Sequence, residues 1–541
     1  MRKKKQYEAI YAGYVYDKPS TYWTATDEVK RSLMEIDLNC PSEINKGGMP
    51  IISEGEKAYI DADDGHTAII ACSGMKKSIC GFLPLVYVLA NANENMILTD
   101  PKGEIYSRTS GFLKSIGYNI LCLDFRTMDK DCFNILGHAA SVYRNENKNK
   151  GLSLLSDIIN VLAEKQRQCA KDPFWPDTGA LWMNGTGAIM LDAFPKIEQV
   201  NVLNWSDFNV KDSASIVEEY LLSQMPENTV KAALKQCLSS ADNTFKSIIA
   251  TASSFLAMFN QNPMLADMLS HSSFTMEDLL KSKTVLFLVT DDTTSTADPI
   301  LGMIINQIQS FLIDKAYHSK NGKLDLRINF ILDEFASIPI PNMDKALATH
   351  RSRNIRYYIC VQSLALLKER YENPEKLLSN CASLIYFGST ELELLKELET
   401  KLGTTRITPN GSEKPLCSQA ELMTLKKSWN YKEVIYMNLS KEIRYCTEFP
   451  SIEKYNISGH QIKFHNNAIP KTEIYSVEEF VSDVFNRRIR APFVVEEKRG
   501  TRKEKKNKRA QKNKISGTVL SDAEIEEQFM HKFDELFGED D

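Results

Sequence analysis

The chain has 541 residues with 43% hydrophobic and 25% charged side chains, and its formal net charge is −5. This composition is ordinary for soluble globular proteins, and the length predicts about three domains or one large domain with insertions. The small negative charge excludes a global basic field, so any binding of nucleic acid must be local.

The cysteines and the apolar runs argue against two further classes of protein. The eleven cysteines include no CxxC pair, which argues against a zinc knuckle and favours buried thiols in a reducing compartment. The longest apolar run, Ile79–Ala90, has 12 residues and contains Pro84, whereas a membrane-spanning helix needs about 20 residues. No targeting signal is visible, so we expect a cytoplasmic protein.

Residues 1–65 are expected to form an N-terminal segment, irregular apart from a helix near Asp27–Glu35. Residues 66–149 then hold three short apolar runs separated by segments of helix length. This alternation predicts βαβ units and a parallel sheet. The expected strands are His66–Ala71, Asn95–Thr99 and Tyr118–Asp124.

Strand signals nearly vanish over residues 150–280, where we expect an inserted all-α domain. Its expected helices are Leu152–Lys165, Ala214–Met225, Thr229–Leu238 and Thr244–Phe259. The sheet is expected to resume over residues 281–470. Its further strands are expected at Thr284–Thr290, Arg327–Leu332, Ile355–Val361 and Ala382–Phe387.

The segment Ala71–Ser78 follows the first expected strand and resembles a phosphate loop, G-x-x-x-x-G-K-[ST]. Ala71 and Lys76 replace the two glycines, while Lys77 and Ser78 occupy the lysine and magnesium-ligand positions. The glycines of such a loop let backbone N–H groups point at phosphate oxygens, so their loss weakens the match. Taken alone, the segment is equally well an ordinary strand–turn–helix corner.

Polar groups follow other expected strands at the edge where α/β sheets place their ligands. Asp333 and Glu334 are adjacent carboxylates, which repel each other unless a cation lies nearby; in P-loop ATPases such a pair holds magnesium and orients water. Asp100–Glu104 (DPKGE) is a charged turn, which taken alone is equally a solvated turn. Gln362 ends a later strand and could sense the γ-phosphate, and Arg351 could reach a neighbouring subunit's nucleotide as an arginine finger.

The order of these motifs resembles that of the type IV secretion coupling proteins of conjugation, the TraG-like family. The resemblance covers residues 60–460 and is carried by several longer segments. They are NMILTDPKGEIYSRTSGFLKSIGYNILCLD, INFILDEFASIPIPNMDKALATHRSRNIRYYICVQSLALLKERY and SNCASLIYFGST, together with Phe133-Asn134, Asp172–Trp175 and Phe245–Phe259.

This resemblance implies an α/β fold: a RecA-like P-loop ATPase core with a central, mostly parallel sheet and an inserted all-α domain. Residues 66–149 and 281–470 would be the two parts of the nucleotide-binding domain. By position, catalysis would fall to Lys77, Glu334, Arg351 and Gln362, nucleotide binding to Ser73, Gly74, Lys76, Lys77 and Ser78, and metal binding to Ser78 and Asp333.

The resemblance also implies ATP and Mg²⁺ as cofactors and a homo-hexamer as the active form. Such a motor recruits relaxase–DNA complexes or protein substrates to the proteins of a secretion channel. Two departures leave alternatives open. The eroded phosphate loop favours a non-catalytic scaffold that docks substrates without efficient ATP hydrolysis. Most family members carry N-terminal transmembrane helices, whereas no such run is visible in this sequence, so we expect a separate membrane subunit to hold this chain at the inner face of the cell membrane.

Residues 471–497 are expected to form a C-terminal extension, 498–520 a basic flexible linker, and 521–541 an acidic amphipathic helix. The basic run either neutralises DNA phosphates or is a solvated linker. The amphipathic helix is expected to pack on a partner protein or a neighbouring domain, because its acidic polar side disfavours anionic lipid.

Overall fold

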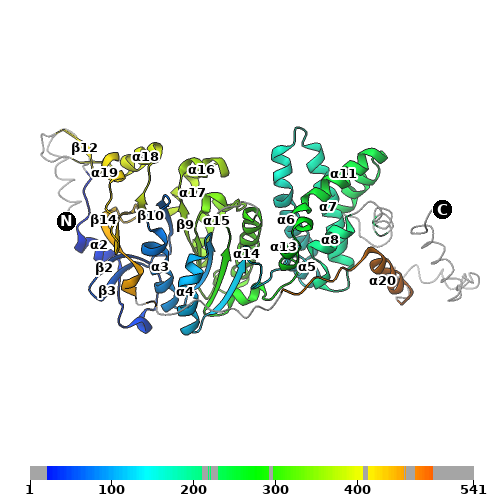
Figure 1. Cartoon of the computed structure of the whole chain (residues 1–541), viewed down its shortest axis with the longest axis horizontal. Helices are drawn as coiled ribbons and strands as arrows, with labels where there is room; N and C mark the ends of the chain where they lie inside the picture. The colour runs from blue at the N-terminus through cyan, green and yellow to red at the C-terminus, as the bar shows by residue number, and fades with distance from the viewer. Residues whose placement is uncertain are drawn as a thin grey trace, which may run out of the picture. The chain divides into compact units, whose positions relative to one another are not determined.

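The computed structural model describes residues 21–209, 217, 220, 229–291, 297–405, 412–455, 457 and 469–490 (Figure 1). The expected basic linker, the expected acidic helix and most of the expected helix Ala214–Met225 lie outside this part of the chain.

A nine-stranded sheet forms the core, with strand order β14-β13-β10-β4-β9-β8-β5-β7-β6. The strands are β4 (His66–Ala71), β5 (Asn95–Asp100), β6 (Asn119–Asp124), β7 (Thr284–Val289), β8 (Ile328–Leu332), β9 (Ile355–Val361), β10 (Cys381–Gly388), β13 (Tyr431–Asn438) and β14 (Ile443–Pro450). The strands from β10 across to β6 pair in parallel, and β13 and β14 add to β10 as an antiparallel edge. The prediction of a mostly parallel central sheet is therefore confirmed, and its parallel strands are largely apolar because both faces are covered.

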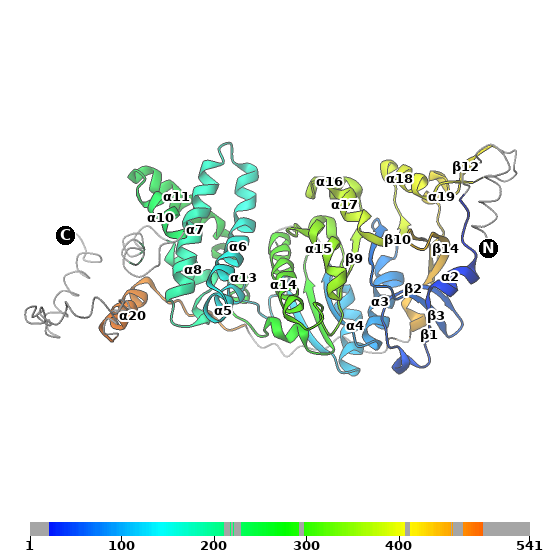
Figure 2. The ribbon, with the colours of Figure 1, turned by 180° about the vertical axis from the view of Figure 1, so that it is seen from behind.

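The helices of the core lie on both faces of this sheet. The chain crosses the sheet in one direction from β4 to β6 and in the other from β7 to β10, so right-handed crossovers place the connecting helices on opposite faces. Figures 1 and 2 show the sheet from either side. The helices are α3 (Leu83–Asn91) and α4 (Glu104–Ser115) for the first direction, and α14 (Asp298–His318), α15 (Met343–Thr349), α16 (Leu364–Arg370) and α17 (Pro374–Ser379) for the second.

The N-terminal segment is more regular than its sequence indicated. After α2 (Thr26–Ser32) comes a three-stranded antiparallel sheet of order β1-β3-β2, whose core side chains join the cluster that packs around α3. Its strands are β1 (Met34–Asp37), β2 (Met49–Glu54) and β3 (Lys57–Asp61), with η1 (Pro41–Glu43) between the first two. The expectation of an irregular segment with a helix reaching Glu35 is thus wrong, because such short strands of mixed polarity leave no clear period in the sequence.

The described elements between β6 and β7 are helical. They are α5 (Gly137–Asn145), α6 (Lys148–Cys169), α7 (Phe174–Ala193), η3 (Ile197–Gln199), α8 (Val202–Phe208), α10 (Thr229–Leu238), α11 (Asp242–Phe255), α12 (Ala257–Gln261), α13 (Pro263–Met268) and η5 (Met276–Leu280). Helix α5 is bonded to the end of α7, since Arg144 donates to the carbonyl oxygens of Leu191 and Phe194. We therefore propose that the inserted domain starts near Gly137 rather than at residue 150.

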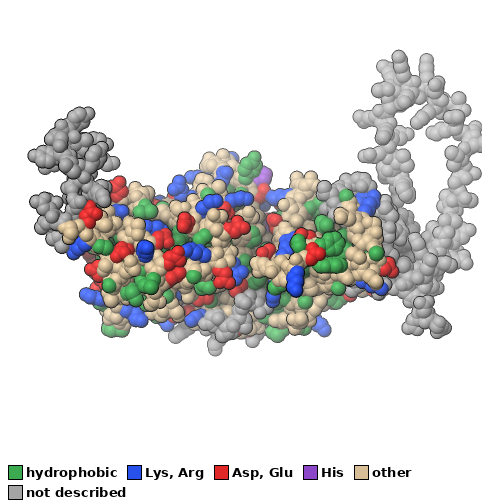
Figure 3. Space-filling view, turned by 90° about the horizontal axis from the view of Figure 1, so that it is seen from above, with side chains coloured by type: hydrophobic (Ala, Val, Ile, Leu, Met, Phe, Trp, Pro, Cys, Tyr) green, Lys and Arg blue, Asp and Glu red, His purple; other side chains and the backbone are tan. Residues whose placement is uncertain are grey.

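The rest of the chain returns from the sheet to these helices. The remaining elements are α18 (Leu392–Leu402), β11 (Thr404–Thr405), β12 (Lys414–Pro415), α19 (Gln419–Met423), η8 (Ile452–Tyr455) and α20 (Val477–Arg490). Phe480 packs against Phe194 and Phe208 of the helical region. Within the described residues, no helix is both long enough and apolar enough to span a membrane. Acidic and basic side chains are interspersed over the face in Figure 3, as the small net charge leads one to expect.

Candidate functional site

The eroded phosphate loop keeps a backbone shape that glycine would favour. It links β4 to the π-helical turn η2 (Lys77–Phe82), and two of its residues, Gly74 (φ 77°) and Lys76 (φ 62°), are left-handed. A left-handed conformation costs a non-glycine residue about 1–2 kcal/mol. Lys76 thus stands where the motif has its second glycine and adopts a conformation that glycine adopts without cost.

The Lys76 side chain turns away from the loop interior. Its Nζ donates to the carbonyl oxygens of Ser428 (2.6 Å) and Trp429 (2.9 Å), which precede β13. Phosphate binding by Lys76 therefore remains a prediction for its backbone N–H. The predicted residues Ser73 and Gly74 are exposed.

Lys77 points the other way, into the acidic pair. Its Nζ lies 2.6 Å from Asp333 Oδ1 and 3.9 Å from Glu334 Oε1, and the side chains of Lys77 and Asp333 are only 13% and 8% exposed. Burial lowers the pKa of Lys77, but the surrounding Cys360, Asp333 and Glu334 outweigh it and raise the pKa above its usual value. The cation that two adjacent carboxylates require is therefore supplied by Lys77.

The turn after β8 fixes the two acids. Asp333 Oδ1 accepts the Glu334 N–H at 2.8 Å, and Thr99 Oγ1 on β5 donates to the Asp333 carbonyl at 2.8 Å. Glu334 is itself left-handed (φ 53°) and begins the turn η6 (Phe335–Ser337). Its Oε1 accepts a hydrogen bond from Gln362 Nε2 at 2.7 Å. The fold thus brings Lys77, Asp333, Glu334 and Gln362 together at the carboxyl ends of three parallel strands.

The DPKGE turn is structured rather than solvated. Asp100 is 2% exposed, and its Oδ2 accepts the Tyr106 N–H at the start of α4. Burial, helped by the like charge of Asp333, raises the pKa of Asp100 to about 6. Arg126, which is paired with Asp124 after β6, donates to the Lys102 carbonyl oxygen and closes the turn from the other side.

Arg351 lies away from this cluster within one chain. It belongs to η7 (His350–Arg353), which precedes β9, whereas Gln362 follows the same strand. Arg351 is exposed at the side of the sheet where the parallel strands begin, which we call the amino edge, as opposed to the carboxyl edge where these strands end. A catalytic role for Arg351 therefore remains a prediction that requires a neighbouring subunit.

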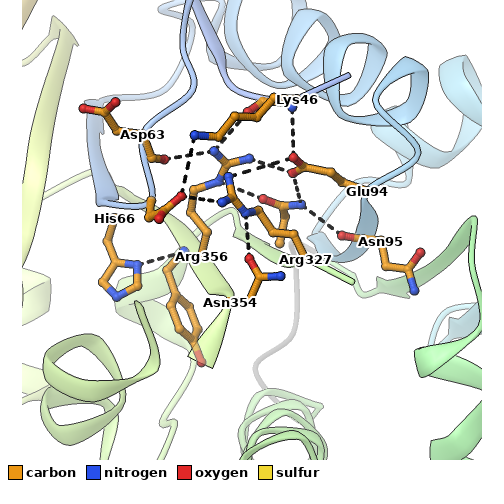
Figure 4. Close-up of polar contacts among 12 residues, drawn as sticks. Lys46, Asp63, His66, Glu94, Asn95, Arg327, Asn354 and Arg356 are labelled. Atoms are coloured by element: carbon orange, nitrogen blue, oxygen red, sulfur yellow. Dashed lines mark hydrogen bonds and ion pairs between the residues drawn. The ribbon is translucent and has the colours of Figure 1, made fainter. Parts of the chain in front are cut away.

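The amino edge also holds a buried ion-pair network, shown in Figure 4. Arg356, 1% exposed, places Nη2 2.9 Å from Glu94 Oε2. Its other nitrogens donate to Asn329 Oδ1 and to the carbonyl oxygens of Gly47 and Asp63. This network joins the N-terminal segment to the strands that carry the candidate site at their opposite ends.

Several residues that shape the site were missed by the sequence motifs. Thr99 holds the Asp333 backbone, and the Cys360 thiol, whose pKa burial raises, lies beside Asp333. Gly388 (φ 146°) accepts the Cys72 N–H through its carbonyl oxygen, and a Cβ there would lie 3.1 Å from Met75 Sδ. Gly388, which ends the apolar stretch YFG, was the only one of these residues that a sequence pattern could have marked. The contacts of Thr99 and Cys360 with Asp333 join segments that are distant in sequence.

The chemistry of the donors suits a hard divalent cation. Asp333 supplies carboxylate oxygens and Ser78 a hydroxyl, and oxygen ligands are what Mg²⁺ prefers. In the described part of the chain, no group of three or more His, Cys, Asp or Glu residues could hold a metal by itself. The remaining ligands would therefore come from phosphate oxygens and water, as is usual for magnesium at nucleotide sites.

Comparison with known proteins decides the family. The sequence profile described as "Type IV secretory system Conjugative DNA transfer" matches residues 22–446. The chain belongs to this family of type IV coupling proteins.

The solved structures agree on the fold of this coupling protein. The bacterial conjugative coupling protein TrwB in its unbound form is 14% identical, with a TM-score of 0.55 over 84% of this chain and 97% of that one. TrwB in complex with the ATP analogue ADPNP gives a TM-score of 0.56 at 14% identity, covering 84% of this chain and 97% of TrwB. TrwB with ADP and Mg²⁺ gives 0.54 at 14% identity, covering 85% of this chain and 100% of TrwB. The RecA-like P-loop core is thereby confirmed. Among curated proteins, none matches the sequence.

Proposed function

We propose that this coupling protein is an ATP-driven motor and receptor, which recruits relaxase–DNA complexes or protein substrates to a type IV secretion channel. The observation that carries the proposal is the cluster in which Lys77 contacts Asp333 while Glu334 accepts a hydrogen bond from Gln362. Solved complexes of TrwB with ADPNP, and with ADP and Mg²⁺, support nucleotide use by this fold.

Each residue of the cluster has a role that its position supports. Backbone N–H groups of the phosphate loop from Ser73 to Ser78 would hold phosphate oxygens, and Lys77 would neutralise the β- and γ-phosphates. Asp333 and the Ser78 hydroxyl would hold Mg²⁺, which supplies positive charge to the transferred phosphoryl group when bound. Glu334 would orient the attacking water, and Gln362, bonded to Glu334, would report the state of the site to β9.

The active form is proposed to be a homo-hexamer. Arg351 is exposed at the edge opposite its own site, so it can complete a site only in a neighbouring subunit. A finger supplied in this way makes hydrolysis depend on assembly.

The non-catalytic scaffold is the weaker candidate. It rests on the lost glycines, yet Lys76 adopts the left-handed conformation that the second glycine would have had. The lysine and the acidic pair are also held together in a buried contact, at the positions where P-loop ATPases place their phosphate-binding lysine and metal-binding acid.

The test compares ATP hydrolysis by assembled protein, with Mg²⁺ and with or without single-stranded DNA, for the wild type and Glu334→Gln. We expect the variant to turn over at least about 100-fold more slowly, because the water-orienting carboxylate is lost. The matched control is Glu393→Gln, an exposed glutamate paired with Lys368 on the surface, which should hydrolyse ATP normally. Equal rates for wild type and Glu334→Gln would refute the motor, whereas tight binding of Mg²⁺–ATP in a nucleotide titration would count against the scaffold.

A further inference from the structure

A short hairpin lies against the phosphate loop and has no role in the account so far. It comprises residues 426–433, leading into β13, and we call it the loop-side hairpin. Lys426 and Glu433 exchange two hydrogen bonds, and the Ser428 N–H donates to the Tyr431 carbonyl oxygen across the turn. The Asn430 carbonyl oxygen accepts the Ser451 N–H beyond β14. The tip of the hairpin is therefore held from several sides.

Two lysines link this hairpin to the phosphate loop, one donating from the loop to the hairpin and one from the hairpin to the loop. Lys76 of the loop donates to the carbonyl oxygens of Ser428 and Trp429, while Lys427 of the hairpin donates to the Gly74 carbonyl oxygen at 3.2 Å. The residue that erodes the glycine motif is thus the one that fixes the hairpin. An anion held by the loop would lie near the positive charges of Lys77 and of Lys427, which donates to the Gly74 carbonyl oxygen, whereas the Lys76 ammonium faces the hairpin.

Trp429, at the tip of the hairpin, is 79% exposed, the largest exposed fraction among the exposed large hydrophobic side chains of the described residues. Its carbonyl oxygen accepts a hydrogen bond from Lys76 of the phosphate loop, so the backbone that carries the indole is held next to this loop. Such preorganisation lowers the conformational cost of binding. An exposed aromatic face beside a cationic anion site matches the two halves of a nucleotide, since any base can stack on an aromatic ring.

We propose that the loop-side hairpin is a wall of the nucleotide site, and that the Trp429 indole is the platform on which the base stacks. Lys76 is the positioning residue that holds this platform in place. The proposal rests on nucleotide binding at the phosphate loop, as proposed above. Stacking reads the flat face of a base and not its hydrogen-bonding edge, so ATP and GTP should use the platform alike.

The test separates the base from the phosphates. Dissociation constants of Mg²⁺–ATP, Mg²⁺–GTP and Mg²⁺–tripolyphosphate are measured by calorimetry for the full-length wild type, Trp429→Ala and Trp429→Phe. Trp429→Ala should bind ATP and GTP about tenfold or more weakly and should bind tripolyphosphate as the wild type does. Trp429→Phe should retain most of the affinity, because it keeps an aromatic face.

Two further variants sharpen the result. Lys76→Gly restores the consensus glycine but removes both hydrogen bonds from the Lys76 side chain to the hairpin tip. It should bind tripolyphosphate as the wild type does, and its affinity for ATP should fall toward that of Trp429→Ala. Trp175→Ala removes a different exposed tryptophan, on α7, and should change nothing.

Unchanged ATP affinity in Trp429→Ala, or an equal loss for tripolyphosphate, would overturn the platform and leave the motor standing. A wild type that binds neither ATP nor tripolyphosphate would overturn the proposed function itself.

Discussion

Two adjacent cations, Lys76 and Lys77, take different directions from the phosphate loop. Lys76 donates to backbone carbonyl oxygens, which carry no net charge, whereas Lys77 contacts the carboxylate of Asp333 in a buried pair. Removing a cation from a buried pair leaves its partner uncompensated, and that is far more costly than losing a hydrogen bond to a carbonyl oxygen.

Lys77→Met should therefore lower the free energy of unfolding at pH 8 by about 3 kcal/mol. Urea denaturation measures the loss, and Lys76→Met is the matched control. Equal losses in the two variants would contradict the role given to Lys77.

The carboxyl of Asp100 predicts a second pH dependence. Its pKa in the folded protein is raised to about 6 from 3.8, so the native state binds this proton more tightly than the unfolded chain does. The protonated Asp100 therefore contributes to the free energy of unfolding, fully below pH 4 and progressively less as the pH rises to about 6. At 1.36 kcal/mol per pKa unit, the contribution that is lost is roughly 3 kcal/mol.

Asp100→Asn keeps an oxygen that can accept the Tyr106 N–H and removes the titration. Its unfolding free energy should fall less between pH 4 and pH 7 than that of the wild type. Denaturation curves across this range test the difference. Parallel pH profiles for the two proteins would show that Asp100 ionises normally.

At the scale of elements, the two ends of the parallel strands have different roles. The candidate site lies in the loops after β4, β8 and β9, at the carboxyl edge of the sheet. At the amino edge, the buried ion pair of Arg356 and Glu94 links the strands. Because Arg356 also holds the Gly47 and Asp63 carbonyl oxygens, it links the N-terminal segment to the core.

Arg356→Met should destabilise the fold by about 3 kcal/mol, because the buried Glu94 loses the nearer of its two guanidinium partners and keeps only Arg327, 3.9 Å away. The double variant Arg356→Met, Glu94→Gln should recover part of the loss, since the stranded charge is gone. Arg353→Met, whose guanidinium bonds only the Gly322 carbonyl oxygen among the described residues, is the control. Chemical denaturation of the three proteins decides the point, and a double variant less stable than Arg356→Met would count against it.

At the scale of the whole molecule, the proposed site is incomplete within one chain. The acids and the candidate finger lie at opposite edges of the sheet, so we propose that a complete site combines Glu334 of one subunit with Arg351 of the next. In a ring, this is a head-to-tail interface.

Glu334→Gln and Arg351→Ala should each be inactive alone, yet a mixture of the two should hydrolyse ATP. With random assembly at equal amounts, about a quarter of such interfaces pair an intact Glu334 with an intact Arg351, so up to that share of activity should return. Mixing must follow disassembly of the two preparations. Arg353→Ala should remain active alone, and a mixture no more active than its parts would exclude a shared site.

Much of the fold could be predicted from the sequence. The strands His66–Ala71 and Ile355–Val361 match the structure at both ends, and the others of the parallel sheet agree within two residues. These strands are buried on both faces, so each is an apolar run that a single sequence shows clearly. The antiparallel strands β1 to β3, β13 and β14 were missed because partly exposed strands mix polar and apolar residues.

The sequence by itself determined the kinds of residue available for chemistry: a lysine after an eroded glycine loop, two acids and a glutamine, each next to an apolar strand. Local spacing is enough for this, because parallel strands bring their carboxyl ends to one edge. Only the tertiary structure decided which partners these side chains have. That Lys76 holds Trp429 while Lys77 holds Asp333, and that Arg351 lies at the far edge, depends on contacts between segments distant in sequence. Such contacts follow from the packing of the whole chain and leave no local pattern.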